Sequence, residues 1–247
     1  MIDQLPQTVQ RSLFALVIVV CFFEFSGVDM LVQRGFFDVG MGQWLLTRDS
    51  QPWRFLMYDG IKKVFLLLTL GLFLAVTLAH QKVAWIRQHR RPLVVVLLTM
   101  IFVPVVVNFL KWYTDIPCPR DIRPFGGSAP YVTLFEHYPA WFLHDSSLRC
   151  YPAGHASGGF ALMSLFFLFK QRRFQYLGLA IGLTLGWTTG MYKMAIGDHF
   201  LSHTVVSMLI AWIVACVTAY FILREKRLDP MADTDTEETA VWQSAND

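Results

Sequence analysis

The chain has 247 residues, of which 55% are hydrophobic and only 16% are charged, and its formal net charge is +3. A single soluble core cannot bury so large a share of apolar side chains, so the composition excludes an ordinary soluble domain and indicates a protein whose solvent is lipid. The cations gather in short clusters beside apolar runs, which also argues against a nucleic-acid partner.

Six apolar runs have about the length that crosses roughly 30 Å of hydrocarbon as a helix, which is about 17 to 25 residues. The fourth run is short and begins with a Gly-rich stretch, so we expect its outer end to lie against protein. Glycines recur every four residues in the fifth run, at Gly178, Gly182 and Gly186, a spacing typical of close helix packing. The runs are residues 12–28, 63–80, 93–110, 157–170, 176–192 and 204–223.

These runs predict an all-α, polytopic membrane protein with six transmembrane helices in one helical bundle, which forms a single domain over residues 1–228. No small-x-small cleavage site follows the first run, so we expect that run to remain as a helix instead of being removed as a signal peptide. Residues 229–247 are acidic, polar and without periodicity, which predicts a disordered cytoplasmic tail.

Positive charges near the ends of the runs predict the orientation of the helices. Residues 81–92 carry four Lys and Arg and no acid, and the short segments 170–175 and 224–227 are also basic. We therefore expect these segments and both termini on the cytoplasmic side. The long loop 111–156 and residues 190–203 then lie on the opposite side of the membrane.

The four cysteines divide between the apolar runs and the long loop. Cys21 and Cys216 fall inside runs, where a thiol packs as a small hydrophobic group. Cys118 and Cys150 both fall in the loop, on the side where an oxidising exterior permits a disulfide. The sequence leaves open whether they form a bridge or remain two thiols, because a bridge needs Cα atoms about 4.4–6.8 Å apart.

Three polar segments stand at the same predicted ends of the helices, where alternating helix direction brings them to one face of the membrane. In the second of them, Gly154 and His155 open a helix whose free backbone N–H groups can bind an anion, although the same pattern is also an ordinary helix start. The segments are NFLKWYTDIPCPRDIRPFGG (108–127), CYPAGHASGG (150–159) and GMYKMAIGDHFLSH (190–203).

His199 and His203 in the third segment are four residues apart, so a helix would place both imidazoles on one face. Taken alone, this pair is compatible with a metal site, with acid–base or nucleophilic chemistry, or with simple packing. Nearby cations favour the second reading, because charges that hold phosphate oxygens, one attacking imidazole and one proton donor are what metal-free phosphoryl transfer needs. The cations are Lys111, Arg120, Arg123 and Lys193.

The three segments resemble the three signature motifs of the type 2 phosphatidic acid phosphatase (PAP2) family, K-x6-R-P, P-S-G-H and S-R-x5-H-x3-D. The matching residues are Lys111 with Arg120 or Arg123, then PAGH, then YKMAIGDHFLSH, and the resemblance covers roughly residues 93–222. The Arg follows Lys111 by nine or twelve positions instead of seven, so proximity favours Arg120 whereas the Arg-Pro pair favours Arg123.

The resemblance implies a role for each residue of the motifs. It implies that His199 is the nucleophile, His155 the general acid, and His203 the residue that orients His199. It implies a phosphate site made of Lys111, Arg120 or Arg123, Gly154 and Lys193, with no metal and no cofactor.

Three motif positions depart from the family pattern. Ala153 stands where the family has Ser, Lys193 where it has Arg, and His203 where it has Asp. A neutral imidazole at His203 can accept a hydrogen bond from His199 but brings no negative charge, so Asp198 is an alternative source of that charge. Lysine likewise keeps the positive charge but lacks the guanidinium fork.

The resemblance further implies a lipid phosphatase of the bacterial inner membrane whose active site faces the periplasm or exterior. The expected substrate is a phosphate or diphosphate of an envelope lipid, such as lipid A, undecaprenyl diphosphate or phosphatidylglycerol phosphate, processed through a phosphohistidine. The alternatives are a lipid-to-lipid phosphotransferase in the same fold and a metal-dependent hydrolase with His199, His203 and either His155 or Asp198 as ligands. An ion path through the membrane is less favoured, because the His and Lys residues of the three segments lie at helix ends and only Glu24 falls inside an apolar run.

Overall fold

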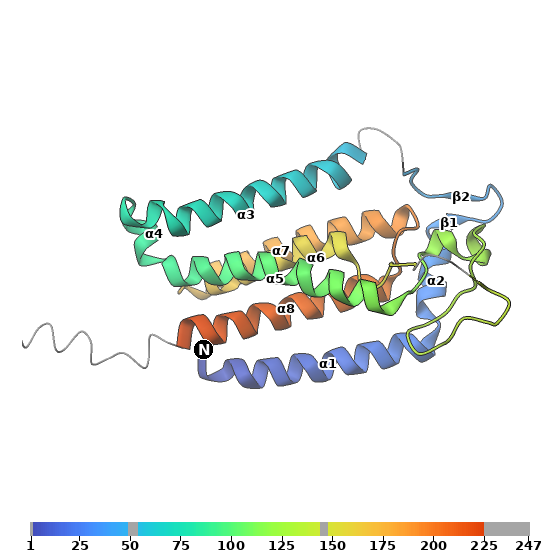
Figure 1. Cartoon of the computed structure of the whole chain (residues 1–247), viewed down its shortest axis with the longest axis horizontal. Coiled ribbons are helices and arrows are strands. Elements are labelled where there is room, and N and C mark those ends of the chain that lie inside the picture. The colour runs from blue at the N-terminus through green and yellow to red at the C-terminus, as the bar shows by residue number, and fades with distance from the viewer. Residues whose placement is uncertain (1, 49–53, 144–147, 225–247) are drawn as a thin grey trace, which may run out of the picture.

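The computed structural model describes residues 2–48, 54–143 and 148–224. Long helices make up most of these residues and run side by side along one direction (Figure 1). Each of the six apolar runs overlaps one long helical segment, and the runs 12–28, 63–80 and 157–170 extend two or three residues past the end of theirs. Those segments are α1 (Leu5–Ser26), α3 (Ile61–Thr77), α5 (Arg90–Thr114), α6 (Gly154–Ala161) with the 3-10 stretch Leu162–Phe167, α7 (Arg172–Ala195) and α8 (Leu201–Arg224).

Short elements connect the long helices, and one of them is a small hairpin that the all-α prediction did not include. Strands β1 (Phe37–Asp38) and β2 (Gln43–Trp44) form a small antiparallel hairpin. Its turn is held by Asp38, whose Oδ1 accepts hydrogen bonds from the N–H groups of Gly40 and Met41. Two-residue strands leave no periodicity for the sequence to reveal. The other short elements are α2 (Val28–Arg34), α4 (Ala84–Gln88), the π-helical Phe55–Gly60, and the 3-10 turns Ile2–Gln4, Ala79–Gln81, Pro119–Asp121 and Arg123–Phe125.

The centre of the bundle is α6 with its 3-10 continuation, which packs against α5, α7 and α8. Backbones of α6 and α7 touch, because a methyl group on Gly159 would come within 2.5 Å of the Gly186 nitrogen. A methyl group on Gly182 would come within 2.2 Å of the Met163 nitrogen. The four-residue glycine spacing predicted that a neighbouring helix approaches closely, and these contacts confirm that prediction.

Within the described residues, three helical stretches are long and apolar enough to cross a membrane, namely Ile2–Ser26, Arg90–Asp121 and Leu201–Arg224. Large apolar side chains also cover the outside of the bundle, with Phe25 83% exposed and Leu66 67% exposed. Lipid tolerates such a surface and water does not, so the chain is a membrane protein. Helix α3 has 17 residues, and α6 with its 3-10 continuation runs only from Gly154 to Phe167, so both are shorter than these three stretches.

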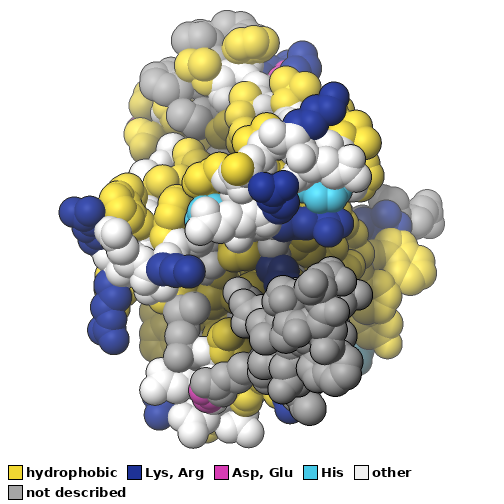
Figure 2. Space-filling model, turned by 90° about the vertical axis from the view of Figure 1, so that its left-hand side faces the viewer, with side chains coloured by type: hydrophobic (Ala, Val, Ile, Leu, Met, Phe, Trp, Pro, Cys, Tyr) yellow, Lys and Arg dark blue, Asp and Glu magenta, His cyan; other side chains and the backbone are white. Residues whose placement is uncertain are grey.

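The two ends of the bundle differ in what they carry. At the basic end lie the connections from α3 to α5 and into α7, together with the last turn of α8 (Figure 1). Figure 2 faces this end and shows more Lys and Arg than Asp and Glu. The site end carries α2, the hairpin and the start of α6. Exposed cations of the basic end are Lys82, Arg87, Arg90, Lys170, Arg172, Arg173 and Arg224. The tail predicted for residues 229–247 lies outside the described residues.

Candidate active site

The three polar segments meet at the site end. The end of α5 brings Lys111 to the start of α6, where a methyl group on Gly154 would lie 3.5 Å from Lys111 Nζ. Directly before α6, the Ala153 N–H donates to the carbonyl of His203 in α8 at 3.1 Å. The Arg120 N–H donates to the carbonyl of Gly197, in the turn between α7 and α8, at 3.0 Å. Backbone hydrogen bonds thus join all three motifs.

Asp198 holds two of the predicted cations beside each other. Its Oδ2 accepts from Lys193 Nζ at 2.7 Å, and its Oδ1 forms an ion pair with the Arg120 guanidinium. Lys193 is only 1% exposed, so its charge depends on this pairing. The turn that places Asp198 requires Gly197, whose φ is +74°. Because both Asp198 oxygens face cations, the carboxylate holds Lys193 and Arg120 next to each other.

His203 is the residue that faces His199. Their Nδ1 atoms lie 3.4 Å apart, so one ring is placed to donate and the other to accept, and both side chains are buried. The His203 ring is further packed edge-on against Tyr151 and Phe200. This arrangement orients the His199 ring and leaves its Nε2 as the nitrogen turned away from His203.

Burial and positive charge keep His199 neutral. Its pKa lies well below the usual 6.5, first because the ring is buried and then because Lys111, His203, His155 and Lys193 add positive charge around it. A neutral imidazole has a free lone pair. His199 is therefore in the protonation state that a nucleophile needs.

His155 lies at the start of α6, where positive charges also surround it. Burial, followed by the charges of Lys193, Lys62, Lys111 and Arg48, lowers the pKa of His155 from 6.5 to about 3. A bound phosphate dianion would offset those cations and favour the protonated ring. His155 can therefore become a proton donor when an anion is present, although without one it is neutral.

The structure separates the two arginines that the sequence left as alternatives. Arg120 pairs with Asp198 beside Lys193. The Arg123 guanidinium instead stacks on the Trp141 ring at 4.0 Å, and its Nε donates to the Ser128 carbonyl at 3.3 Å. These contacts hold Arg123 within the loop and bring Arg120 to the cluster.

A disulfide closes the loop that carries Arg120. Cys118 and Cys150 are bonded, with Cα atoms 5.2 Å apart, so the bridged alternative is the one found. Cys118 lies two residues before Arg120, and Cys150 lies five residues before His155. The bridge therefore links the first motif directly to the second.

Ligand atoms of Cys150, His199 and His203 all lie within 4.8 Å of one another, the kind of grouping that can hold a metal ion. The Cys150 sulfur, however, is bonded to Cys118. A metal ligand has to be a thiolate, so this sulfur is not available while the bridge is intact.

No motif or spacing in the sequence indicated that the N-terminal region would reach the site. Gln33 Nε2 donates to the Met194 carbonyl at 2.9 Å, and Asp29 Oδ1 accepts from the Ser202 N–H at 2.8 Å. Trp44 packs so closely on Gly197 that a methyl group there would lie 2.4 Å from its ring. Each contact spans more than 150 residues of sequence, and no periodicity or motif could have revealed it.

The buried Lys193 and the half-buried Lys111 and Arg120 surround a histidine pair at one end of a bundle of apolar helices, which defines a membrane protein with a positively charged site. The model of the PAP2 superfamily matches residues 92–227, more than half of the chain, and the chain belongs to this superfamily. Membership supports a phosphatase that acts on phosphate esters, and it confirms the predicted resemblance to the PAP2 family. No curated protein and no solved structure gave a match.

Proposed function

We propose that the chain is a metal-independent phosphatase of membrane lipids that hydrolyses a phosphate or diphosphate ester through a phosphohistidine on His199. One observation carries the proposal: a buried, neutral His199 lies against His203 beside the paired cations Lys193 and Arg120. Such a site offers a nucleophile and preorganised positive charge in one place.

In the first step, His199 Nε2 attacks phosphorus, a nitrogen–phosphorus bond forms, and the bond from phosphorus to the lipid oxygen breaks. His155 gives its proton to that oxygen. The phosphoryl oxygens are held by Lys111, Lys193, Arg120 and the N–H groups at Gly154.

In the second step, water attacks phosphorus and the nitrogen–phosphorus bond breaks. His155, neutral after the first step, takes the proton of the attacking water, so both histidines return to their starting states. Inorganic phosphate leaves, and the dephosphorylated lipid remains in the bilayer.

The proposed topology has six membrane crossings within residues 1–228, with the basic end in the cytoplasm and the site end at the outer face of a bacterial inner membrane. The exposed cations of the basic end support this orientation. At the site end, Trp112 and Tyr113 are 62% and 79% exposed beside Lys111, as expected for aromatic residues at a lipid–water boundary.

The proposed substrates are envelope lipids whose phosphate reaches this boundary, such as lipid A, undecaprenyl diphosphate or phosphatidylglycerol phosphate. The superfamily supports phosphate-ester chemistry, and the apolar helices beside the site suit a substrate whose tails stay in the membrane.

The test is release of inorganic phosphate by detergent-purified protein from a panel of these lipids in the presence of a strong chelator. The proposal expects release from at least one lipid presented alone. Release only when a second lipid serves as acceptor would identify a phosphotransferase, and complete loss of activity with the chelator would support the metal-dependent hydrolase.

A further inference from the structure

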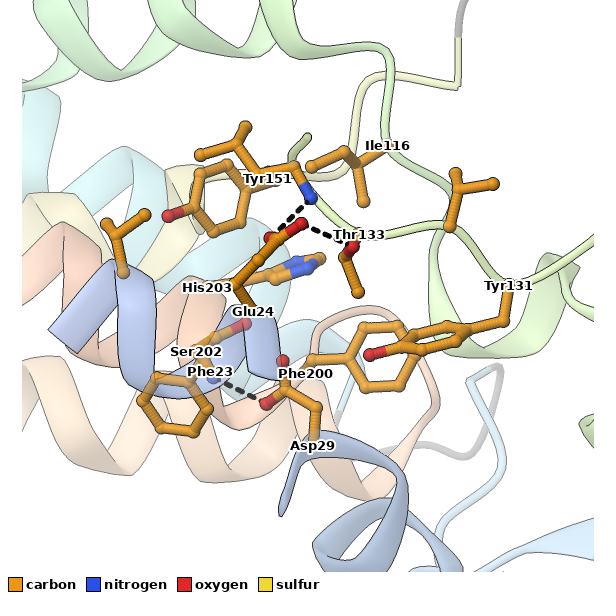
Figure 3. Close-up of a pocket in the computed structure, with 13 residues that line it drawn as sticks. Phe23, Glu24, Asp29, Ile116, Tyr131, Thr133, Tyr151, Phe200, Ser202 and His203 are labelled. Carbon is orange, nitrogen blue, oxygen red and sulfur yellow. Dashed lines mark hydrogen bonds between the residues drawn. The ribbon is translucent and has the colours of Figure 1, made fainter. Parts of the chain in front are cut away.

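Asp29 is a buried carboxylate that reaches the site from outside the residues matched by the family model. It lies in α2 and is 5% exposed. Its Oδ1 accepts from the N–H of Ser202, at the start of α8, as the dashed line between them in Figure 3 marks. Ser202 directly precedes His203, so Asp29 acts on the helical turn that presents this histidine.

A small cavity connects Asp29 with His203. Both line a space of about 30 Å³ together with Glu24, Tyr131 and Tyr151 (Figure 3). A space of this size accommodates a water molecule. Away from bulk water a charge acts on its neighbours more strongly.

The two carboxylates of this cavity have different surroundings. Glu24 accepts hydrogen bonds from Thr133 Oγ1 at 2.6 Å and from the N–H groups of Leu134 and Phe135 at 3.0 Å, so it anchors the long loop to α1. Asp29 accepts from Ser202 at the N-terminus of α8, where free N–H groups stabilise an anion. Burial raises the pKa of Asp29 to about 6, so it is mainly ionised at neutral pH.

His203 needs a nearby negative charge, because the imidazole of His199 becomes cationic when it accepts a phosphoryl group. A carboxylate at the last position of the third motif would meet this need, and this chain has a histidine there. His203 also forms a hydrogen bond with the backbone of Cys150. A negative charge across the shared cavity further favours the tautomer with the proton on Nε2, whose Nδ1 accepts from His199.

We propose that Asp29 is a positioning residue for His203, supplying from α2 the negative charge that the last position of the third motif lacks in this chain. The inference rests on the proposed function of His199 and His203. It differs from a simple helix cap, since a cap needs only a hydrogen-bond acceptor whereas this role needs the charge.

Asp29→Asn separates the two roles, because the amide keeps an acceptor for the Ser202 N–H and removes the charge. We expect kcat for phosphate release to fall about 10- to 100-fold, the usual range for residues that support a reacting group, with KM within about two-fold of wild type. Glu24→Gln is the matched control and should retain most of kcat. Full kcat in Asp29→Asn, or a larger loss in Glu24→Gln, would overturn the inference.

A second measurement does not depend on turnover. In protein with 15N-labelled histidine, the His203 signal, assigned with a His203→Gln variant, should report a proton on Nε2 in wild type and a mixture of tautomers in Asp29→Asn. An unchanged tautomer contradicts the inference. If wild type released no phosphate from any lipid, the proposed function would fail, and this spectrum would still decide the role of Asp29.

Discussion

Both ends of the helical bundle carry Lys and Arg, but the surroundings of these side chains differ. At the basic end the cations are exposed, and Arg173 is an example at the start of α7. At the other end of the same helix, Lys193 is 1% exposed and bound to Asp198. Water screens the first charge, whereas the second lowers the pKa of both His155 and His199. Burial therefore decides whether a cation can prepare a reaction site, and the number of charges does not.

The largest expected effect concerns the nucleophile of the site end. His199→Ala should lower phosphate release by at least about three orders of magnitude, because it removes the nucleophile that forms the covalent intermediate. The measurement is kcat at equal amounts of folded, purified protein. His137→Ala, which removes an exposed imidazole of the long loop, is the control and should remain active. More than a tenth of wild-type activity in His199→Ala would reject the assignment.

The two ends of α7 offer a direct test of the comparison. Lys193→Ala should lower kcat/KM about 100- to 1,000-fold, as expected for loss of a buried group that stabilises transition-state charge. It should also reduce stability by about 3–5 kcal/mol, because Asp198 loses one of its partners. Arg173→Ala should change kcat/KM by less than about two-fold, since an exposed cation is worth little. Similar losses in the two variants would remove the distinction between the ends.

The arginines of the long loop sharpen the comparison within the site end. Arg120→Ala should lower kcat/KM about 10- to 100-fold, because it removes a charged contact to the phosphate and a partner of Asp198. Arg123→Ala should cost at most about three-fold, because this side chain packs on Trp141. The same phosphate-release assay measures both, and the reverse order of effects would assign the phosphate to Arg123.

The smallest expected effect is the uptake of protons when phosphate binds. Because the pKa of His155 is about 3 in the free protein, the ring is neutral at pH 7, and binding of a phosphate dianion should raise that pKa. Phosphate binding should therefore take up a fraction of a proton, up to one per site. Calorimetry in two buffers with different ionisation enthalpies measures this uptake, and His155→Gln should abolish it. Release of protons on binding would have the wrong sign for a general acid.

Much of the fold could be predicted from the sequence, because local patterns determine it. Apolar runs of sufficient length form helices in lipid, and each of the six runs overlaps a long helical segment. The glycine spacing in α7 predicted a close neighbour, although it could not say that the neighbour would be α6. The β1–β2 hairpin was missed, because its two-residue strands depend on contacts with the turn at Gly197 and not on periodicity.

Within the site, the sequence by itself determined which side chains have the right chemistry, because spacing on a helix places His199 and His203 on one face. Only the tertiary structure decided which groups pair. It brings Arg120 and not Arg123 to Asp198, and it carries Asp29 to the start of α8. The physical reason is that ion pairs and hydrogen bonds depend on distances of a few ångströms between residues far apart in the chain, and only the packing of the helices sets those distances.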